Sequence, residues 1–244
     1  MADAIEERDK LLAKAEQEKL DLLRSMYPAG VAERVSNGAE VTAETVSNIT
    51  VAVALIGGLE MLTANRSAAE VRSILNALLD ALNSTAISQG VEPVRSLGES
   101  YVAVCGLSSP RFDHASRTVT WARAATRAIQ RLEYDWMKFV SLRFGLASGE
   151  LDVLLLGRCH AAYDIWGNTL SVARCIVQET EPGYISLSDS TYTLLTDVDG
   201  FKPRPPIENP ALGTITTWSR PLVERLALEV ITPPESQSLP YAAK

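Results

Sequence analysis

The run NITVAVALIGG, from Asn48 to Gly58, is the feature that most constrains the fold of this chain. It is β-branched and apolar almost throughout, and no polar residues alternate with the apolar ones. A strand with one solvated face would alternate, so a strand of this composition must be covered on both faces. The sequence therefore predicts a central strand in a sheet that other elements cover on each side.

Helical and strand patterns alternate after this run. Residues 67–90 carry one apolar stripe at helical spacing, and residues 92–107 suit a β-hairpin that turns at Gly98-Glu99-Ser100. The further expected elements are a helix from about His114 to Phe139, strands in 140–157, a helix in 168–179, a strand in 183–188, a short helix in 188–195, a proline-rich loop in 203–213, and strands in 214–218 and 222–231. The order β-α-β-β-α-β predicts an α+β fold with a ferredoxin-like split βαβ core.

Residues 4–26 form the most strongly helical segment, since they lack Gly and Pro and are rich in Ala, Leu, Glu and Lys. A seam at coiled-coil spacing is made by Leu12, Ala15, Lys19, Leu22 and Met26. Two interpretations stay open, a coiled-coil-like signalling helix and a surface helix packed on the domain. We assign residues 1–40 to this helix and a linker, 41–232 to the main domain, and 233–244 to a disordered tail.

Composition excludes several classes of function. The net charge of −7 argues against binding to nucleic acid, because a surface that follows phosphates is basic. Cys105, Cys159 and Cys175 are scattered and are expected to be reduced thiols, and the two histidines form no zinc-ligand cluster. No apolar run approaches the roughly 20 residues of a membrane span. The expected location is the cytoplasm, or the inner face of the cell membrane if the chain belongs to a larger membrane protein.

Four segments in order resemble the class III nucleotide cyclase catalytic domain: LLRSMYPAGVAERVSNG, SLGESYVAVCGL, LRFGLASGELDVLLLG and YDIWGNTLSVARCIVQETEPGYISLS. The resemblance implies a homodimer in which the 3′-hydroxyl of ATP or GTP attacks the α-phosphate and pyrophosphate leaves. It also implies two divalent ions held by two aspartates. An asparagine and an arginine from the opposite subunit stabilise the transition state, and a lysine and an aspartate read adenine.

The metal positions implied by the resemblance are altered. Leu55 stands where the first aspartate belongs, and leucine cannot coordinate Mg²⁺. Glu99 stands at the second position, where its longer side chain displaces the carboxylate. It is either a metal ligand or a carboxylate solvated at a turn. Glu60 lies five residues beyond Leu55 and is not expected to substitute for the lost aspartate. We therefore expect Mg²⁺ or Mn²⁺ to bind weakly or not at all.

The nucleotide-binding positions are partly retained. Pro93 stands at the lysine position and offers no charge, whereas Asp164 is kept. Asp164 is expected either to accept a hydrogen bond from adenine or to cap the helix that starts near Gly167. The backbone N–H groups of residues 56–59 (Ile56, Gly57, Gly58 and Leu59) form the expected phosphate cradle.

The transition-state pair implied by the resemblance is replaced by Ser171 and Cys175. Arg174 is adjacent to Cys175, but one helical residue rotates a side chain by about 100°, so it is expected to point away. The family's lysine-containing segment near the end is replaced by IENPALG.

Two functions follow as hypotheses. One is a catalytically impaired cyclase homology domain that dimerises and transmits a signal, coupled by its leading helix to an upstream sensor or membrane domain. The other is a divergent, weakly active, Mn²⁺-dependent adenylate or guanylate cyclase. A nucleotide or another small molecule bound in the former substrate cleft is a further expectation.

Overall fold

The computed structural model describes residues 2–26, 32, 36, 44–64, 66–132, 140–156 and 162–223 of the 244-residue chain. Its helices are α1 (Ala2–Met26), α3 (Leu59–Thr63), α4 (Ala68–Gln89), α5 (His114–Gln130), α6 (Asn168–Gln178) and α7 (Asp189–Tyr192). Its strands are β1 (Glu44–Gly57), β2 (Glu92–Leu97), β3 (Ser100–Cys105), β4 (Ser141–Leu156), β5 (Ala162–Trp166), β6 (Tyr184–Ser188), β7 (Lys202–Asn209) and β8 (Gly213–Pro221). The predictions for residues 133–139, 224–231 and 233–244, and for Cys159, fall outside the described residues.

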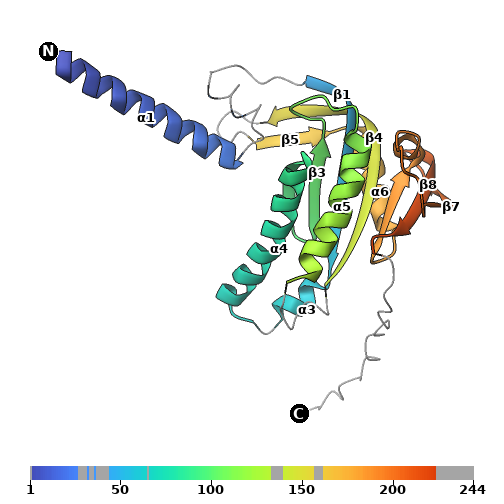
Figure 1. The fold of residues 1–244 in the computed structure, drawn as a ribbon. Helices are drawn as coiled ribbons and strands as arrows, with labels where there is room; N and C mark the ends of the chain where they lie inside the picture. The colour runs from blue at the N-terminus through green and yellow to red at the C-terminus, as the bar shows by residue number, and fades with distance from the viewer. Residues whose placement is uncertain are drawn as a thin grey trace, which may run out of the picture.

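The described strands form one sheet in the order β2-β3-β1-β4-β6-β8-β7, and β5 pairs with β4 (Figure 1). β1 is antiparallel to both of its neighbours, β3 and β4, so it is hydrogen-bonded along both edges. β4 and β6 are parallel, as a split βαβ core requires. The predicted central strand and the predicted α+β fold are both confirmed.

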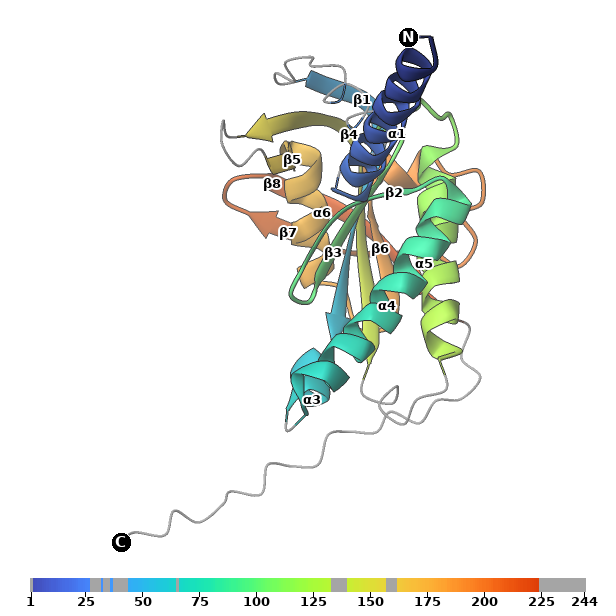
Figure 2. The ribbon, with the colours of Figure 1, turned by 90° about the vertical axis from the view of Figure 1, so that its left-hand side faces the viewer.

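Side chains alternate along β1, and each set enters a different core. Ala52, Ala54 and Ile56 belong to the cluster that packs under α4 and α5, whereas Val51 and Val53 belong to the cluster under α6. In Figure 2 β1 and β4 pass between α6 on their left and α4 and α5 on their right. Because both faces are covered, the strand needs apolar residues at successive positions.

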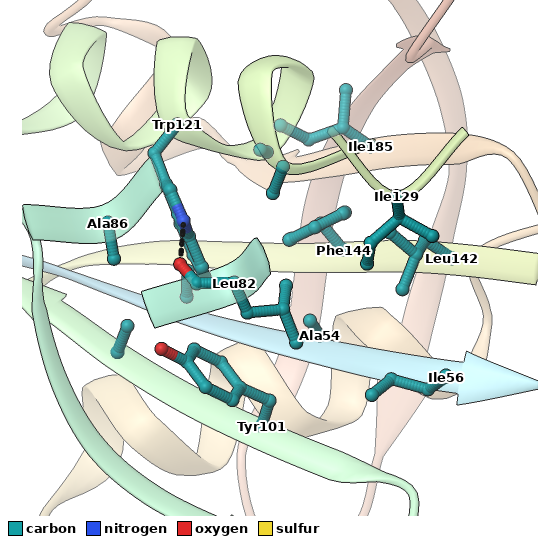
Figure 3. Packing of buried hydrophobic residues seen from close by; sticks show 14 of the residues in the cluster. Ala54, Ile56, Leu82, Ala86, Tyr101, Trp121, Ile129, Leu142, Phe144 and Ile185 are labelled. Atoms are coloured by element: carbon teal, nitrogen blue, oxygen red, sulfur yellow. Dashed lines mark hydrogen bonds between the residues drawn. The ribbon is translucent and has the colours of Figure 1, made fainter. Parts of the chain in front are cut away.

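Three aromatic side chains pack together in the core under α4 and α5. Trp121 is fully buried, and its ring centroid lies 5.5 Å from that of Phe144 and 5.8 Å from that of Tyr101. The indole Nε1 of Trp121 donates a hydrogen bond of 3.3 Å to the carbonyl of Leu82 (Figure 3). The tryptophan therefore joins α5 to α4 as well as to the sheet.

A buried polar layer ends this core. His114 Nδ1 lies 2.6 Å from Thr50 Oγ1, which lies 2.8 Å from Ser148 Oγ. Ser148 donates its proton to Thr191 Oγ1 at 3.0 Å. A hydroxyl has only one proton, so Thr50 must donate to Ser148, and His114 Nδ1 must donate to Thr50. The hydrogen-bond directions thus assign to His114 the tautomer with its proton on Nδ1.

The approach of α6 to the sheet depends on Gly145 of β4. A Cβ atom at this position would lie 2.5 Å from the carbonyl oxygen of Ala173 and 2.5 Å from the amide nitrogen of Val177. Both of those atoms belong to the α6 backbone, which cannot turn aside as a side chain does. Glycine therefore sets how closely α6 lies on β4.

Residues 203–213 do not form the expected proline-rich loop, because most of them belong to β7 and its hairpin with β8. β7 is the last strand of the sheet order, where one edge needs no hydrogen-bond donors, so proline is tolerated there. The pairing with β8 passes over Pro205 and Pro206, between Arg204 and Ile207. The loop prediction was wrong because it did not consider an edge strand.

The predicted N-terminal helix is confirmed as α1, which projects away from the sheet (Figure 1). The side chains of residues 5–19 are exposed, and Leu11 and Leu12 are more than half exposed. The interpretation of this segment as a helix packed on the domain is therefore wrong for these residues. Neither α1 nor any other described helix combines the length and apolar character of a membrane span.

Candidate functional site

A hollow of about 720 Å³ lies between the sheet, α6 and the tip of the β7–β8 hairpin, and we call it the front hollow. It is lined by Val53, Leu55, Arg95, Ser100, Val102, Ser171, Arg174, Cys175, Val177, Gln178, Glu179, Asn209, Ala211 and Leu212. Its size is typical of a site for a small molecule. It brings together Leu55, Ser171 and Cys175, which the sequence analysis singled out separately.

Leu55 lies in the wall that the sheet contributes to the front hollow. It is half-buried and pairs with Ser100 of β3 and Arg143 of β4. Leu55 packs with the apolar cluster on the α6 side of the sheet. The first predicted metal position is therefore an apolar surface that offers no oxygen ligand.

Glu99 lies at the tip of the β2–β3 turn, which is tight because Gly98 has a positive φ of 58°. Its carboxyl hydrogen-bonds with the carboxyl of Glu60, and this hydrogen bond, partial burial and the charge of Glu60 raise the pKa of Glu99 above its usual range. Arg143 opposes the shift. Glu60 was not expected at this turn. It belongs to the first turn of α3, which follows the left-handed Gly58 (φ 89°), and the spacing of residues in the sequence does not reveal this change of direction.

Asp164 is engaged within its own chain. Its carboxylate lies 2.5 Å from the guanidinium of Arg95, and it also accepts the N–H of Ile165 at 2.8 Å. Neither contact is with an N–H group at the start of α6, whose N-cap is Gly167, so Asp164 does not act as the cap of this helix. Pro93 forms no part of this pair. The cation that faces Asp164 is Arg95, two positions further along β2.

Three neighbouring positions of α6 face the front hollow. Ser171, Arg174 and Cys175 have the i, i+3, i+4 spacing of one helix face. Asn209 Nδ2, from the β7–β8 hairpin, donates to Cys175 Sγ at 3.6 Å. The expectation that Arg174 points away is wrong, because a long side chain beside position 175 reaches the same hollow. A helical wheel that allows for side-chain length would have included it.

The expected phosphate cradle is partly used by the protein itself. The N–H of Ile56 donates to the carbonyl of Glu99 at 2.9 Å, so it is not free for a ligand. A Cβ on Gly57 would lie 2.5 Å from Ser141 Oγ, so a larger residue there would require the serine side chain to move. Gly58 and Leu59 begin α3, and the carbonyl of Gly58 accepts the N–H groups of Met61 and Leu62. Of the four cradle residues, Ile56 is thus excluded as a donor.

The family model for the adenylate and guanylate cyclase catalytic domain matches residues 41–219, and this chain belongs to that family. An adenylate cyclase of Mycobacterium tuberculosis is 28% identical over 213 residues, which are 86% of this chain and 48% of that protein. The soluble guanylate cyclase subunit alpha-1 of Canis lupus familiaris is 27% identical over 197 residues, which are 81% of this chain and 29% of that protein. This chain thus spans about half the length of the mycobacterial relative and 29% of the length of the canine one.

Solved structures agree with this assignment. The catalytic core of a rhodopsin-guanylyl cyclase in complex with ATPalphaS aligns with a TM-score of 0.68 at 25% identity, over 73% of this chain and 97% of that chain. The adenylyl cyclase CyaB of P. aeruginosa aligns with a TM-score of 0.68 at 20% identity, over 78% and 100% of the two chains. The fold predicted for this chain is therefore the cyclase catalytic fold.

Proposed function

We propose that this chain is a catalytically impaired cyclase domain that serves as a dimerising module in cyclic-nucleotide-type intracellular signal transduction. The observation that carries the proposal is Leu55, an apolar side chain in the wall of the front hollow at the position expected for a metal-binding aspartate. Ser171 and Cys175 line the same hollow and supply neither the amide nor the guanidinium expected there.

The expected loss of reaction rate supports the proposal that the enzyme is impaired. Removal of one group that stabilises charge in a transition state costs about 100- to 1,000-fold in rate. Here an aspartate, an asparagine and an arginine are replaced, and such losses do not simply add. Even a strongly non-additive combination leaves turnover far below that of an ordinary cyclase.

The residues around the β2–β3 turn do not fit a pair of divalent ions. Glu60 and Glu99 are two carboxyl groups that share a hydrogen bond, so one of them must carry the proton that is donated. Across the ranges described above, His, Cys, Asp and Glu nowhere gather in threes. Mg²⁺ at a nucleotide is held by one or two carboxylates in near-ideal octahedral geometry. Leu55 offers no oxygen ligand at the first metal position, so the residues present do not fit two ions.

Dimerisation is supported by the face of the sheet beside α6. Leu55, Val94 and Leu107 are only partly buried, although they pack against the apolar cluster on that side. A second copy of the chain would cover them. A guanylyl cyclase domain from Blastocladiella emersonii, which shares the fold at 23% identity, is described as dimeric in one structure and as monomeric in another. The oligomeric state of the present chain is part of the proposal.

The proposal gives α1 the role of coupling the domain to an upstream sensor or membrane domain, at the inner face of the cell membrane or in the cytoplasm. Its exposed leucines support this role, because they are available to a partner helix. The proposal includes a nucleotide or another small molecule as the occupant of the front hollow.

The alternative function is a divergent, weakly active adenylate or guanylate cyclase that uses Mn²⁺. The contact between Glu60 and Glu99 favours it, because Glu60 brings a second carboxylate to the turn. The pair of Arg95 and Asp164 also favours it, since a charged pair at the purine position keeps a polar edge for a base.

The deciding experiment incubates the purified chain with ATP or GTP, in Mg²⁺ or Mn²⁺, and quantifies cyclic nucleotides by mass spectrometry. The variants Leu55→Asp, Glu99→Ala and Glu60→Ala run alongside. We expect no product from the wild type, and none from Leu55→Asp, because Ser171 and Cys175 remain substituted. Product that disappears in Glu99→Ala would establish the alternative and contradict the proposal.

A further inference from the structure

The outward side of α5 carries Arg123, Arg127 and Arg131, which we call the arginine stripe. These residues are four positions apart, and Arg131 is the C-cap of the helix, so their side chains leave neighbouring points on one side of it. No aspartate or glutamate occurs between His114 and Arg131, although the chain as a whole has a net charge of −7. The stripe is therefore a local concentration of positive charge. In Figure 1 α5 lies in front of the sheet, on the surface of the domain.

The arginines of the stripe have no partners within the ranges that the structure describes. Arg127 and Arg131 are exposed and Arg123 is half-buried, and none of the three guanidinium groups takes part in a hydrogen bond or an ion pair there. Arg117, on the same helix, is instead paired with Asp113 at 2.7 Å. A guanidinium group binds carboxylates and phosphates through paired N–H donors. Three free guanidinium groups side by side thus form a surface that suits an anionic partner.

The helix dipole accounts for only part of this stripe. A positive charge near the C-terminus of a helix is stabilising, but the effect falls off within the last turn. Arg127 lies in the last turn of α5. Arg123 lies about two turns before the end of the helix, beyond the reach of this effect. A role within α5 itself therefore does not explain why all three positions are arginine.

Two large apolar side chains are exposed at the other end of α5. Phe112, which directly precedes the N-cap Asp113, is fully exposed, and Ile87 in the last turn of α4 is 71% exposed. The two helix ends are adjacent, because Arg117 Nη1 donates to the carbonyl of Gln89 at 3.1 Å. This part of the domain thus combines free cations with apolar side chains that no part of the described fold covers.

An anionic lipid surface matches both features. Each arginine near a leaflet of anionic lipids strengthens binding by about five-fold. Phenylalanine and aliphatic side chains enter the boundary between the headgroups and the acyl chains. Nucleic acid also presents phosphates, but its backbone offers no apolar layer behind them. The exposed Phe112 and Ile87 therefore favour a membrane over a nucleic acid as the partner.

We propose that α5 docks the domain on a membrane surface that contains anionic phospholipids, with the arginine stripe on the headgroup phosphates and Phe112 in the interface. The helix is not inserted, because its apolar face is buried in the core, so only its outward side chains make the contact. This inference goes beyond the proposed function, in which α1 provides the coupling to a membrane domain. It holds whether or not the domain is catalytically impaired.

The test sediments the full chain with vesicles of phosphatidylcholine alone and with vesicles that also contain phosphatidylserine. We expect binding to be at least about ten-fold tighter to the anionic vesicles, and added salt should weaken it. Binding to duplex DNA and to polyglutamate is measured in the same buffer. These two polymers represent a nucleic acid and an acidic protein segment.

Variants of the stripe identify the surface. The combined variant Arg123→Gln, Arg127→Gln and Arg131→Gln should lose the preference for anionic vesicles. A control variant changes the net charge equally by removing three exposed lysines outside α5: Lys10→Gln, Lys14→Gln and Lys202→Gln. The control should bind like the wild type.

Phe112→Ser tests the apolar contact separately. It should weaken binding to anionic vesicles about five-fold, since an apolar side chain no longer leaves water, and it should leave the salt dependence unchanged. Equal binding of Phe112→Ser and the wild type would contradict the insertion of Phe112.

Four outcomes would overturn the docking of α5. They are equal binding to neutral and anionic vesicles, wild-type binding by the stripe variant, an equal loss in the lysine control, and binding of DNA or polyglutamate as tight as that of anionic vesicles. The last outcome would assign the stripe to a nucleic acid or an acidic protein. A lower melting temperature of the stripe variant with unchanged vesicle binding would show that the arginines serve only the helix.

Discussion

Among single residues, His114 links the sequence most directly to a measurable property. It is 4% exposed and donates from Nδ1 into the hydroxyl chain through Thr50, while burial lowers its pKa and the charge of Asp113 partly opposes that shift. The unfolded chain therefore binds a proton that the folded protein does not bind, once the pH falls below the ordinary histidine value of about 6.5. The stability that neutral His114 contributes is fully present above that value and is lost as the pH decreases toward its folded pKa.

We accordingly expect the free energy of unfolding, measured by urea denaturation, to fall between pH 7 and pH 5. In His114→Asn the side-chain amide keeps a donor near the position of Nδ1 but does not titrate in this range, so the fall should be smaller. Equal pH dependence in the two proteins would show that His114 is not responsible.

The residues of the front hollow show how far sequence reasoning reaches. Leu55, Ser171 and Cys175 were singled out by the resemblance to class III cyclases, and the structure brings them to one hollow. Arg95 was missed and Glu60 was discounted, because each acts through a contact between segments distant in sequence. Spacing along one strand or helix does not encode the turn at Gly58 or the approach of β2 to β5.

At the scale of elements, the packing of α6 on β4 positions the helix that forms one wall of the front hollow. We expect Gly145→Ala to destabilise the protein by at least about 2 kcal/mol, since overpacking against a rigid backbone typically costs 1–3 kcal/mol. Gly149→Ala is the matched control on the same strand. Its Cβ would meet Thr169 Oγ1 at 2.7 Å, a side-chain atom rather than backbone, and moving it costs the hydrogen bond of this hydroxyl to the Glu150 carbonyl, so the loss should be smaller.

Thermal denaturation followed by circular dichroism measures both glycine variants. A loss for Gly149→Ala as large as that for Gly145→Ala would contradict the assignment of Gly145 as the point of closest approach. The same closeness places Ser171 and Cys175 against the sheet, so ligand binding in the front hollow should weaken in Gly145→Ala as well.

Elements were predictable to the extent that their patterns are local. The buried strand β1, the helix α4 and the β2–β3 hairpin each have a periodicity that fixes their type, and all three are confirmed. β7 was missed because its prolines indicate a loop in isolation. Only its position at the edge of the sheet makes them compatible with a strand, and that position is a property of the whole sheet.

At the scale of the whole molecule, α1 carries the next prediction. Leu12 and Leu22 lie on the predicted seam and are 54% and 63% exposed. If α1 pairs with a second copy, the double variant Leu12→Glu and Leu22→Glu should weaken self-association about ten-fold or more in analytical ultracentrifugation. The thermal midpoint of the domain should stay the same, because both side chains are more than half exposed.

Glu7→Gln is the control for charge and position on the same helix. Unchanged self-association in the double variant would assign the dimer to the sheet face beside α6 instead. A protein that stays monomeric at every concentration would contradict both interfaces.

β1 also has a mechanical consequence. Its 14 residues extend for about 46 Å, from Glu44 to Gly57. Glu60 of α3 follows this end of the strand, and Glu60 contacts Glu99 of the β2–β3 turn. Hydrogen bonds to β3 and β4 hold it on both edges, and sliding by one residue would exchange its two apolar faces. A force that arrives through the segment before β1 therefore cannot be absorbed by slippage. It is passed along β1 toward Leu55, near the end of the strand, in the wall of the front hollow.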